Sequence, residues 1–241
     1  MLTAFDDMPR KDRLIIALDC DADKALYIAY ALRGEASWVK IGMTLYYAYG
    51  SDLIRMLKES GYKVFLDLKF HDIPHQVRGA ARSAASTGAD MLTMHAIGGA
   101  QMMSAAVEGT IEGAEGIDAV APTTLAITVL TSMDEESLHR VGIERSVDDQ
   151  VLSMASLAKE SGVSGVVASP REAWSLRSLL GPEAFIVTPG VRPRDAELGD
   201  QSRVTTPKEA FDNGASHIVI GRPITDAPDP IEAFRAIAAD L

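Results

Sequence analysis

The sequence lacks several features that would place it outside the class of ordinary soluble proteins. Its one cysteine, Cys20, cannot form an internal disulfide, which fits a reducing compartment. Its apolar runs stay well short of the roughly 18 residues that a membrane-spanning helix needs. Residues 1–13 contain no apolar stretch of the kind found in signal peptides. We therefore expect a cytoplasmic protein.

Positive charge is also scarce. The chain has 23 lysines and arginines against 34 aspartates and glutamates, for a net charge of −11. This balance argues against nucleic acid or an anionic membrane as a partner. An acidic protein can still bind a small anion where its few cations converge.

Two sequence motifs are missing as well. No GxGxxG fingerprint follows the first expected strand, so dinucleotide binding lacks its usual signal. No GxSxG elbow is present, which argues against acyl transfer by a serine nucleophile of that type.

Short apolar runs, by contrast, recur along the whole chain. Most are continuous rather than alternating, as expected for parallel strands that are buried on both faces. We predict eight strands, at Leu14–Leu18, Trp38–Ile41, Lys63–Leu68, Met91–His95, Thr124–Leu130, Gly165–Ala168, Phe185–Thr188 and His217–Ile220.

Amphipathic segments with helical spacing lie between these runs. The clearest are Ala22–Leu32, Leu53–Ser60, Gln76–Thr87, Gln150–Glu160 and Pro207–Asn213. A glycine stands near the end of several helical segments, where a left-handed residue closes a helix: Gly34, Gly61, Gly88, Gly162 and Gly214.

Alternation of eight β and α units predicts an α/β fold, a (β/α)₈ TIM barrel. The length of 241 residues suits one such barrel and a large core that needs no disulfide or metal. No linker or low-complexity tract interrupts the chain, so we expect a single domain over residues 1–241. A doubly wound open sheet is the structural alternative.

The segment DLKFHDIP, residues 67–74, is the strongest pointer to a functional site. Asp67 and Lys69 stand two residues apart at the end of a predicted strand, so their side chains project from the same face. Asp72 follows in the next loop. Opposite charges at a strand end are costly to desolvate unless each has partners. We interpret this cluster as functional.

Active sites of (β/α)₈ barrels lie at the carboxyl ends of the strands. Each candidate residue there could by itself be a structural ion pair or a helix cap, but their accumulation predicts an active site. The candidates are Asp19, Lys40, Asp67, Lys69, Asp72, His95, Thr131, Ser132, Thr188, Pro189, Arg192, Gly221 and Arg222.

The loops after the last two strands predict a phosphate site. Such loops bind phosphate in many barrel enzymes. Gly221 would let a phosphate approach the backbone, and Arg222 offers a charged fork. Arg192 and Gln201 lie in a long polar segment, residues 191–206, and a loop of this length is often a lid. Arg222 could alternatively pair with a surface acid.

Histidines offer a weaker alternative site. His71 and His75 flank Asp72, so a His/Asp metal pair is conceivable, but Lys40 and Lys69 would oppose a cation. We expect His95 to pack behind the site rather than to act as a catalytic base. Cys20 lacks a histidine at a spacing that would suggest a nucleophile.

The motifs at these positions resemble those of the orotidine 5′-monophosphate decarboxylase family over nearly the full chain. DLKFHDIP is the most specific of them. The matching segments are LDC (18–20), VKIG (39–42), DLKFHDIP (67–74), MHAIGG (94–99), TVLTS (128–132), TPGVRP (188–193), DQSRVTTP (200–207) and IGRPI (220–224).

The resemblance implies a role for each matching residue. Lys69 corresponds to the catalytic lysine, within a charged network of Lys40, Asp67, Lys69 and Asp72. Asp72 would enter the site of a neighbouring subunit, which implies a homodimer with shared active sites. The implied substrate-binding residues are Asp19, Lys40, Ile73, Gln76, Thr131, Pro189, Arg192, Gln201, Gly221 and Arg222.

The implied reaction is conversion of orotidine 5′-monophosphate (OMP) to UMP and CO₂, without metal or cofactor. The chain departs from the family pattern in two segments: Gln76 replaces a threonine that reaches across the dimer toward the substrate, and Ser216 stands where an aspartate is frequent. Two alternatives stay open: a Mg²⁺-dependent sugar-phosphate decarboxylase or aldolase of the same superfamily, and a phosphate-binding barrel without catalysis. The Mg²⁺ enzymes carry an acid where this chain has Lys40.

Overall fold

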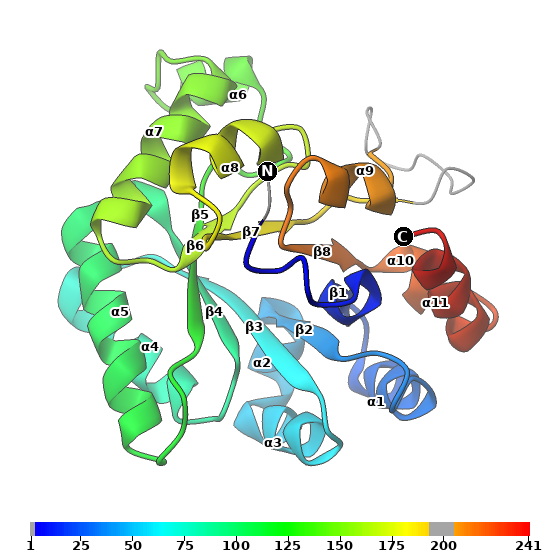
Figure 1. Ribbon diagram of the computed structural model, residues 1–241. Coiled ribbons are helices and arrows are strands. Elements are labelled where there is room, and N and C mark those ends of the chain that lie inside the picture. Colours follow the sequence, from blue (N-terminus) through cyan, green and yellow to red (C-terminus); the bar gives the residue numbers. More distant parts are fainter. Residues whose placement is uncertain (1–2, 193–204) are drawn as a thin grey trace.

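The computed structural model describes residues 3–192 and 205–241, in which eight parallel strands close into a barrel (Figure 1). Each strand pairs with its neighbours in sequence, and β8 closes the ring on β1. This confirms the predicted (β/α)₈ fold and excludes the open sheet. The strands are β1 (Leu14–Ala17), β2 (Trp38–Gly42), β3 (Lys63–Phe70), β4 (Met91–His95), β5 (Thr123–Ile127), β6 (Gly165–Val167), β7 (Phe185–Thr188) and β8 (His217–Ile220).

Helices surround the barrel on its outside (Figure 1). They are α1 (Ala22–Ala31), α2 (Met43–Tyr49), α3 (Ser51–Glu59), α4 (Pro74–Ala85), α5 (Ala100–Glu115), α6 (Glu135–Arg140), α7 (Val147–Glu160), α8 (Ala173–Leu180), α9 (Pro207–Asp212), α10 (Arg222–Thr225) and α11 (Pro230–Ala239), with short 3₁₀ turns η1 (Arg10–Arg13) and η2 (Ala96–Gly98). Across the two described ranges, none of these helices is long and apolar enough to cross a membrane.

Local chemistry explains where many helices begin and end. Side-chain oxygens accept backbone N–H groups at the first turn, which satisfies donors that have no partner within the helix. The capping residues are Asp21, Asp134, Ser146, Thr206 and Asp229. The five glycines predicted to close helices all have positive φ, between 79° and 98°.

The core has an inner and an outer part. Inside the barrel, the strands contribute a layer of apolar side chains that fills the lumen: Ile15, Ala17, Trp38, Phe65, Met91, Leu125, Val187 and Val219. Two larger clusters pack the other strand faces against the helices. Burial on both faces explains why these strands are continuous apolar runs in the sequence.

Near the site, β1, β2 and β6 end within one residue of their predicted bounds, and two strands differ by more. β5 ends at Ile127 rather than Leu130, and Val129 and Leu130 turn into the cavity described below. Both the N–H and the hydroxyl of Thr128 donate to the carbonyl of Val167, which ends the regular ladder there. β3 runs to Phe70 and not to Leu68, but its end is irregular.

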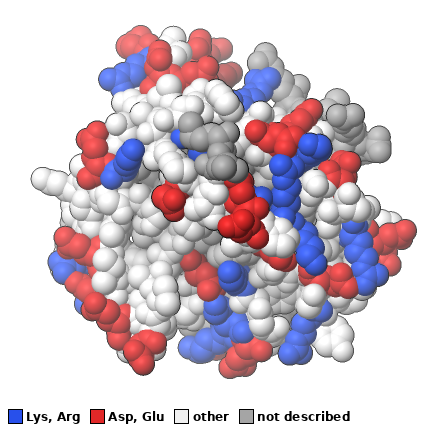
Figure 2. All heavy atoms as spheres, viewed as in Figure 1, with Lys and Arg blue, Asp and Glu red and all other residues white. Residues whose placement is uncertain are grey.

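Acidic and basic side chains are interspersed on the face of the molecule that Figure 2 shows. The net negative charge is therefore not gathered there into a field of one sign. Several of the described charges pair with each other at the surface, as Lys24 does with Asp226 and Arg10 with Asp212. Exposed pairs of this kind contribute little to stability.

Candidate active site

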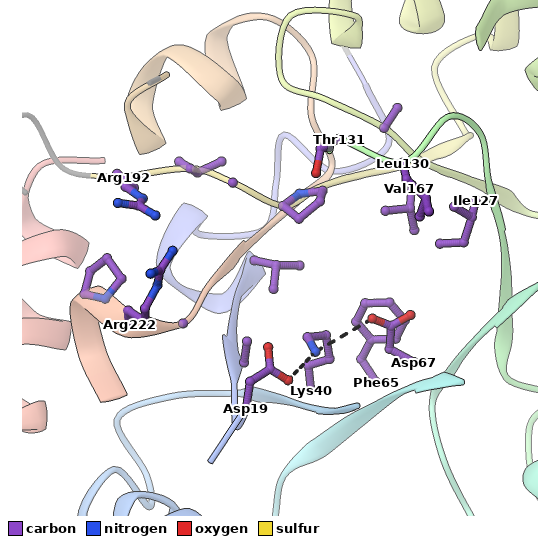
Figure 3. Close-up of a pocket in the computed structure, with 18 of the residues that line it drawn as sticks. Asp19, Lys40, Phe65, Asp67, Ile127, Leu130, Thr131, Val167, Arg192 and Arg222 are labelled. Carbon is purple, nitrogen blue, oxygen red and sulfur yellow. Dashed lines mark hydrogen bonds and ion pairs between the residues drawn. The ribbon is translucent and has the colours of Figure 1, made fainter. Parts of the chain in front are cut away.

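A cavity of about 550 Å³ opens at the carboxyl ends of the strands (Figure 3). Most of the residues proposed from the sequence for the site line it. These are Asp19, Lys40, Asp67, Lys69, Thr131, Pro189, Arg192, Gly221 and Arg222. Parallel strands bring their carboxyl ends to one edge, so residues far apart in the chain meet here.

Four charged side chains form a continuous chain along one side of the cavity. Lys40 Nζ lies 2.8 Å from Asp19 Oδ1 and 3.7 Å from Asp67 Oδ2. Lys69 Nζ donates to the same Asp67 Oδ2 at 2.7 Å. Asp67 thus lies between two ammonium groups, and positive and negative charges alternate from Asp19 to Lys69.

Burial differs sharply along this chain of charges. The side chains of Lys40 and Asp67 are only 10% and 11% exposed, whereas that of Asp19 is 61% exposed. Removing one member of a buried pair leaves an uncompensated charge, at a cost of about 3–5 kcal/mol. The side chain of Lys69, which pairs with Asp67, is 26% exposed, so its ammonium can face the cavity.

The backbone at Lys69 is unusual. Leu66 pairs with Leu92 and Phe70 with Met94, so β3 advances four residues while β4 advances two. Lys69 has φ of 53°, one of only two positive values at non-glycine residues within the described ranges. Left-handed backbone costs a lysine about 1–2 kcal/mol, and such strain is often found at functional sites.

Thr93 is a member of this site that the sequence prediction missed. Its hydroxyl accepts the backbone N–H of Lys69 at 2.8 Å and donates to Asp67 Oδ1 at 2.9 Å. The only signal in the sequence was one hydroxyl within an otherwise apolar run, MLTM. A threonine fits a buried strand through its β-branch alone, so that signal was too weak to act upon.

Cations gather on another side of the cavity, away from the charged chain. Arg192 and Arg222 lie near each other there, while Asp19, Lys40 and Asp67 lie apart from them (Figure 3). Gly221 joins β8 to α10 and also lines the cavity. Its missing side chain leaves the backbone open to a ligand, since a Cβ added at this position would meet nothing closer than Ala17 Cβ at 3.4 Å.

The cavity also has an apolar wall. It is formed by Phe65, Ile127, Val129, Leu130 and Val167. Such a surface can receive a flat ring and keep water from its faces, because it offers no competing hydrogen bonds. Thr131 stands at the edge of this wall (Figure 3).

Six of the described candidate residues do not line the cavity of their own chain: His95, Ser132 and Thr188 at strand ends, and Asp72, Ile73 and Gln76 in the segment after β3. The last three are exposed. Within the described part of the chain, Asp72 accepts only a local bond, from the N–H of Ile73, whose side chain is 63% exposed. Gln201, the remaining prediction, lies outside the described residues.

The histidines next to β3 and β4 form a ring pair. The centroids of His71 and His95 are 5.5 Å apart. Burial lowers the pKa of His95, and the neighbouring His71 and Lys69 lower it further. This environment favours the neutral form of His95. Within residues 3–192 and 205–241, no group of three or more His, Cys, Asp or Glu side chains could hold a metal ion.

Comparison with known proteins agrees with this geometry. The sequence model of the Orotidine 5′-phosphate decarboxylase / HUMPS family matches residues 12–237. The chain belongs to this family. It is 51% identical to the orotidine 5′-phosphate decarboxylase of Moorella thermoacetica over 97% of this chain and 94% of the relative. It is 45% identical to the protein of that name from Maridesulfovibrio salexigens, over 95% of this chain and 98% of the relative.

Solved structures of the family share the fold. The crystal structure of orotidine 5′-phosphate decarboxylase from Lactobacillus acidophilus superimposes with a TM-score of 0.84 at 39% identity, over 95% of this chain and 98% of that one. A Geobacillus kaustophilus protein described as uncharacterized gives a TM-score of 0.83 at 38% identity, over 94% of this chain and 99% of that one.

Proposed function

We propose that this protein is an orotidine 5′-monophosphate decarboxylase. It would convert OMP to UMP and CO₂, the last step of de novo pyrimidine synthesis. The observation that carries the proposal is the ammonium of Lys69, held 2.7 Å from Asp67 at the mouth of a barrel of this family. As an enzyme of nucleotide synthesis with one cysteine, it would act in the cytoplasm, with residues 1–241 as one barrel domain.

The chemistry follows from the position of the charges. The bond between C6 and the carboxylate breaks, and its electron pair stays on C6. The ammonium of Lys69 stabilises that developing negative charge and then transfers a proton to C6. The neutral amine takes up a proton from water afterwards. Preorganised charge in a site that excludes water is usually the largest contribution to catalysis, and this scheme requires no metal or cofactor.

Asp67 contributes in two ways. It orients Lys69 through their shared hydrogen bond. It also places negative charge near the substrate carboxylate, which raises the energy of the bound substrate relative to the transition state. Lys40 lies on the other side of Asp67 and, with Asp19, would hold the ribose hydroxyls.

Substrate binding would use the other two regions of the cavity. Arg192, Gly221 and Arg222, with Gln201, would hold the 5′-phosphate, and the pyrimidine would lie against the apolar wall beside Thr131 and Pro189. The phosphate is remote from C6, so its binding energy can order the charged site rather than merely tighten binding.

We further propose a homodimer in which each subunit contributes to the other's site. Residues 71–76 are all exposed in the single chain, and Asp72 does not reach the cavity of its own barrel. An exposed carboxylate beside an exposed isoleucine suits a surface that a second copy covers. Asp72, Ile73 and Gln76 would then face the partner's substrate.

A sugar-phosphate decarboxylase or aldolase of the same superfamily is the alternative. In the superfamily's Mg²⁺ enzymes the second strand supplies an acidic metal ligand. Here that strand supplies Lys40, whose ammonium lies 2.8 Å from Asp19 and would repel a divalent cation. A barrel that binds phosphate without catalysis is disfavoured because Asp67 and Lys69 keep their ion pair.

The decisive experiment follows the loss of OMP absorbance with and without EDTA. We expect the wild-type protein to turn over OMP equally well in both conditions. Lys69→Ala should lose at least about a thousandfold in kcat, as expected when a charge that stabilises the transition state is removed, and should still bind UMP. An inert wild-type protein, or one that needs a divalent ion, would refute the proposal.

A further inference from the structure

We propose that Thr93 is a positioning residue of this active site, whose hydroxyl fixes both the backbone of Lys69 and the carboxylate of Asp67. The inference deepens the proposed decarboxylase function and rests on it. It assigns a role in catalysis to a buried threonine that touches neither the cavity nor the expected substrate.

The first contact restrains the backbone of Lys69. The irregular pairing of β3 with β4 between Leu66 and Phe70 interrupts the regular ladder at this point. The N–H of Lys69 instead donates to Thr93 Oγ1 at 2.8 Å. Lys69 holds its φ of 53° against the usual preference of a side-chain-bearing residue. One hydrogen bond from a neighbouring strand therefore helps to define where the lysine side chain starts.

The second contact divides the two oxygens of Asp67 between different partners. Oδ1 accepts the Thr93 hydroxyl at 2.9 Å. Oδ2 faces both ammonium groups, with Lys69 at 2.7 Å and Lys40 at 3.7 Å. Without the hydroxyl, the carboxylate could rotate and present one oxygen to each lysine. The ammonium of Lys69 would then point in a different direction and would no longer meet C6.

Thr93 is itself held firmly, which qualifies it as an anchor. Its side chain is completely buried, and β4 is paired on both sides, with Thr93 opposite Leu125 of β5. A β-branched side chain has few rotamers, so its hydroxyl direction is well defined. The hydroxyl acts once as acceptor and once as donor, which matches its hydrogen-bonding capacity.

The expected consequence separates chemistry from binding. Thr93 acts on the lysine and the carboxylate near C6, whereas the proposed phosphate and pyrimidine contacts come from other residues of the cavity. Misplacement of a reacting group by about 1 Å can cost about 100-fold in rate. Loss of the hydroxyl should therefore lower kcat and leave nucleotide affinity nearly intact.

The test compares Thr93→Val, which keeps the shape but not the hydroxyl, with Thr93→Ser, which keeps the hydroxyl. We expect Thr93→Val to lower kcat about 10- to 100-fold, with a UMP dissociation constant within about threefold of wild type. Thr93→Ser should keep kcat within about threefold of the wild-type value. Thr93→Ala gives a second variant without the hydroxyl in case valine prevents folding.

Thr124→Val is the matched control. Thr124 is also a buried strand threonine, and its hydroxyl bonds Ser164 on the side of the barrel away from the cavity. It should lose stability without losing kcat. If both Thr93→Val and Thr93→Ala kept wild-type kcat, or if serine failed to rescue, the inference would be wrong. An inactive wild-type protein would instead overturn the proposed function.

Discussion

Buried titratable side chains at the two ends of the barrel differ in whether they have a charged partner. At the carboxyl end, buried Lys40 and Asp67 neutralise each other within a network of ion pairs and hydrogen bonds. At the amino end, buried His217 pairs with no carboxylate among the described residues. It is surrounded by the rings of Phe5, Trp38 and Phe185, at centroid distances between 5.5 and 5.9 Å.

This environment makes His217 a source of acid sensitivity. Burial lowers the pKa of His217 from 6.5 to about 3, and the nearby cations Arg13 and Lys63 act in the same direction. Below pH 6.5 the unfolded chain binds a proton at this residue and the folded chain does not. Stability from this residue is therefore full above pH 6.5 and is lost as pH falls toward 3.

We expect the free energy of unfolding to fall with a slope from this residue of up to about 1.4 kcal/mol per pH unit between pH 6 and 4. His217→Phe keeps an aromatic ring but cannot titrate, so its slope over that range should be shallower. Urea unfolding at several pH values measures both. Parallel curves for the two proteins would contradict the assignment. Glu172, whose pKa burial raises to about 7, titrates in both proteins and so cancels in the comparison.

At the scale of elements, α4 and α5 lie side by side on the outside of the barrel (Figure 1). Glycines on α5 allow this close approach. A Cβ at Gly109 would come within 2.2 Å of the carbonyl oxygen of Arg78, and one at Gly113 equally close to that of Arg82. Both contacts are with backbone of α4, which cannot move away without shifting the helix.

Gly109→Ala should consequently destabilise the protein, although alanine is the better helix former. Overpacking should lower the free energy of unfolding by about 1–3 kcal/mol. The better helix propensity of alanine offsets about 1 kcal/mol of that loss. The control is Gly116→Ala at the C-cap of the same helix, where the nearest atoms lie at an ordinary 3.5 Å. Thermal unfolding should show a lower Tm for the first variant only; equal Tm values would show that the helices can separate at little cost.

At the scale of the whole molecule, the proposed dimer would complete each site. The chain by itself brings Asp19, Lys40, Asp67 and Lys69 together but leaves Asp72 outside, on its own surface. In a twofold dimer, one residue can leave its own site and complete the partner's, and the same exchange occurs twice by symmetry.

Mixing two inactive variants tests this arrangement. In a hybrid dimer of Lys69→Ala and Asp72→Asn, one site carries both substitutions and the other carries neither. Random reassociation makes half of the dimers hybrid, so activity should return to about a quarter of wild type. Each variant alone, taken through the same dissociation and reassociation, is the control. No recovery in dimers shown to have exchanged would place Asp72 in its own subunit's site.

The fold class and most of the candidate site could be predicted from the amino-acid sequence. Continuous apolar runs revealed the strands because a barrel buries both faces of each one. Polar residues at the ends of those runs revealed the cavity, since parallel strands deliver their carboxyl ends to one place. Asp19, Lys40 and Arg222 could thus be assigned to one site although they are far apart in the chain.

The way in which the charged groups are held could not be predicted from the sequence. The bulge in β3, the left-handed backbone of Lys69 and the two hydrogen bonds of Thr93 depend on the pairing of β3 with β4. The apolar pattern of a strand indicates which side chains face inward. It does not indicate where a bulge places extra residues in one strand opposite its neighbour. In the sequence Thr93 cannot be distinguished from an ordinary strand residue, because its partners Asp67 and Lys69 belong to another strand and approach it only in the folded barrel.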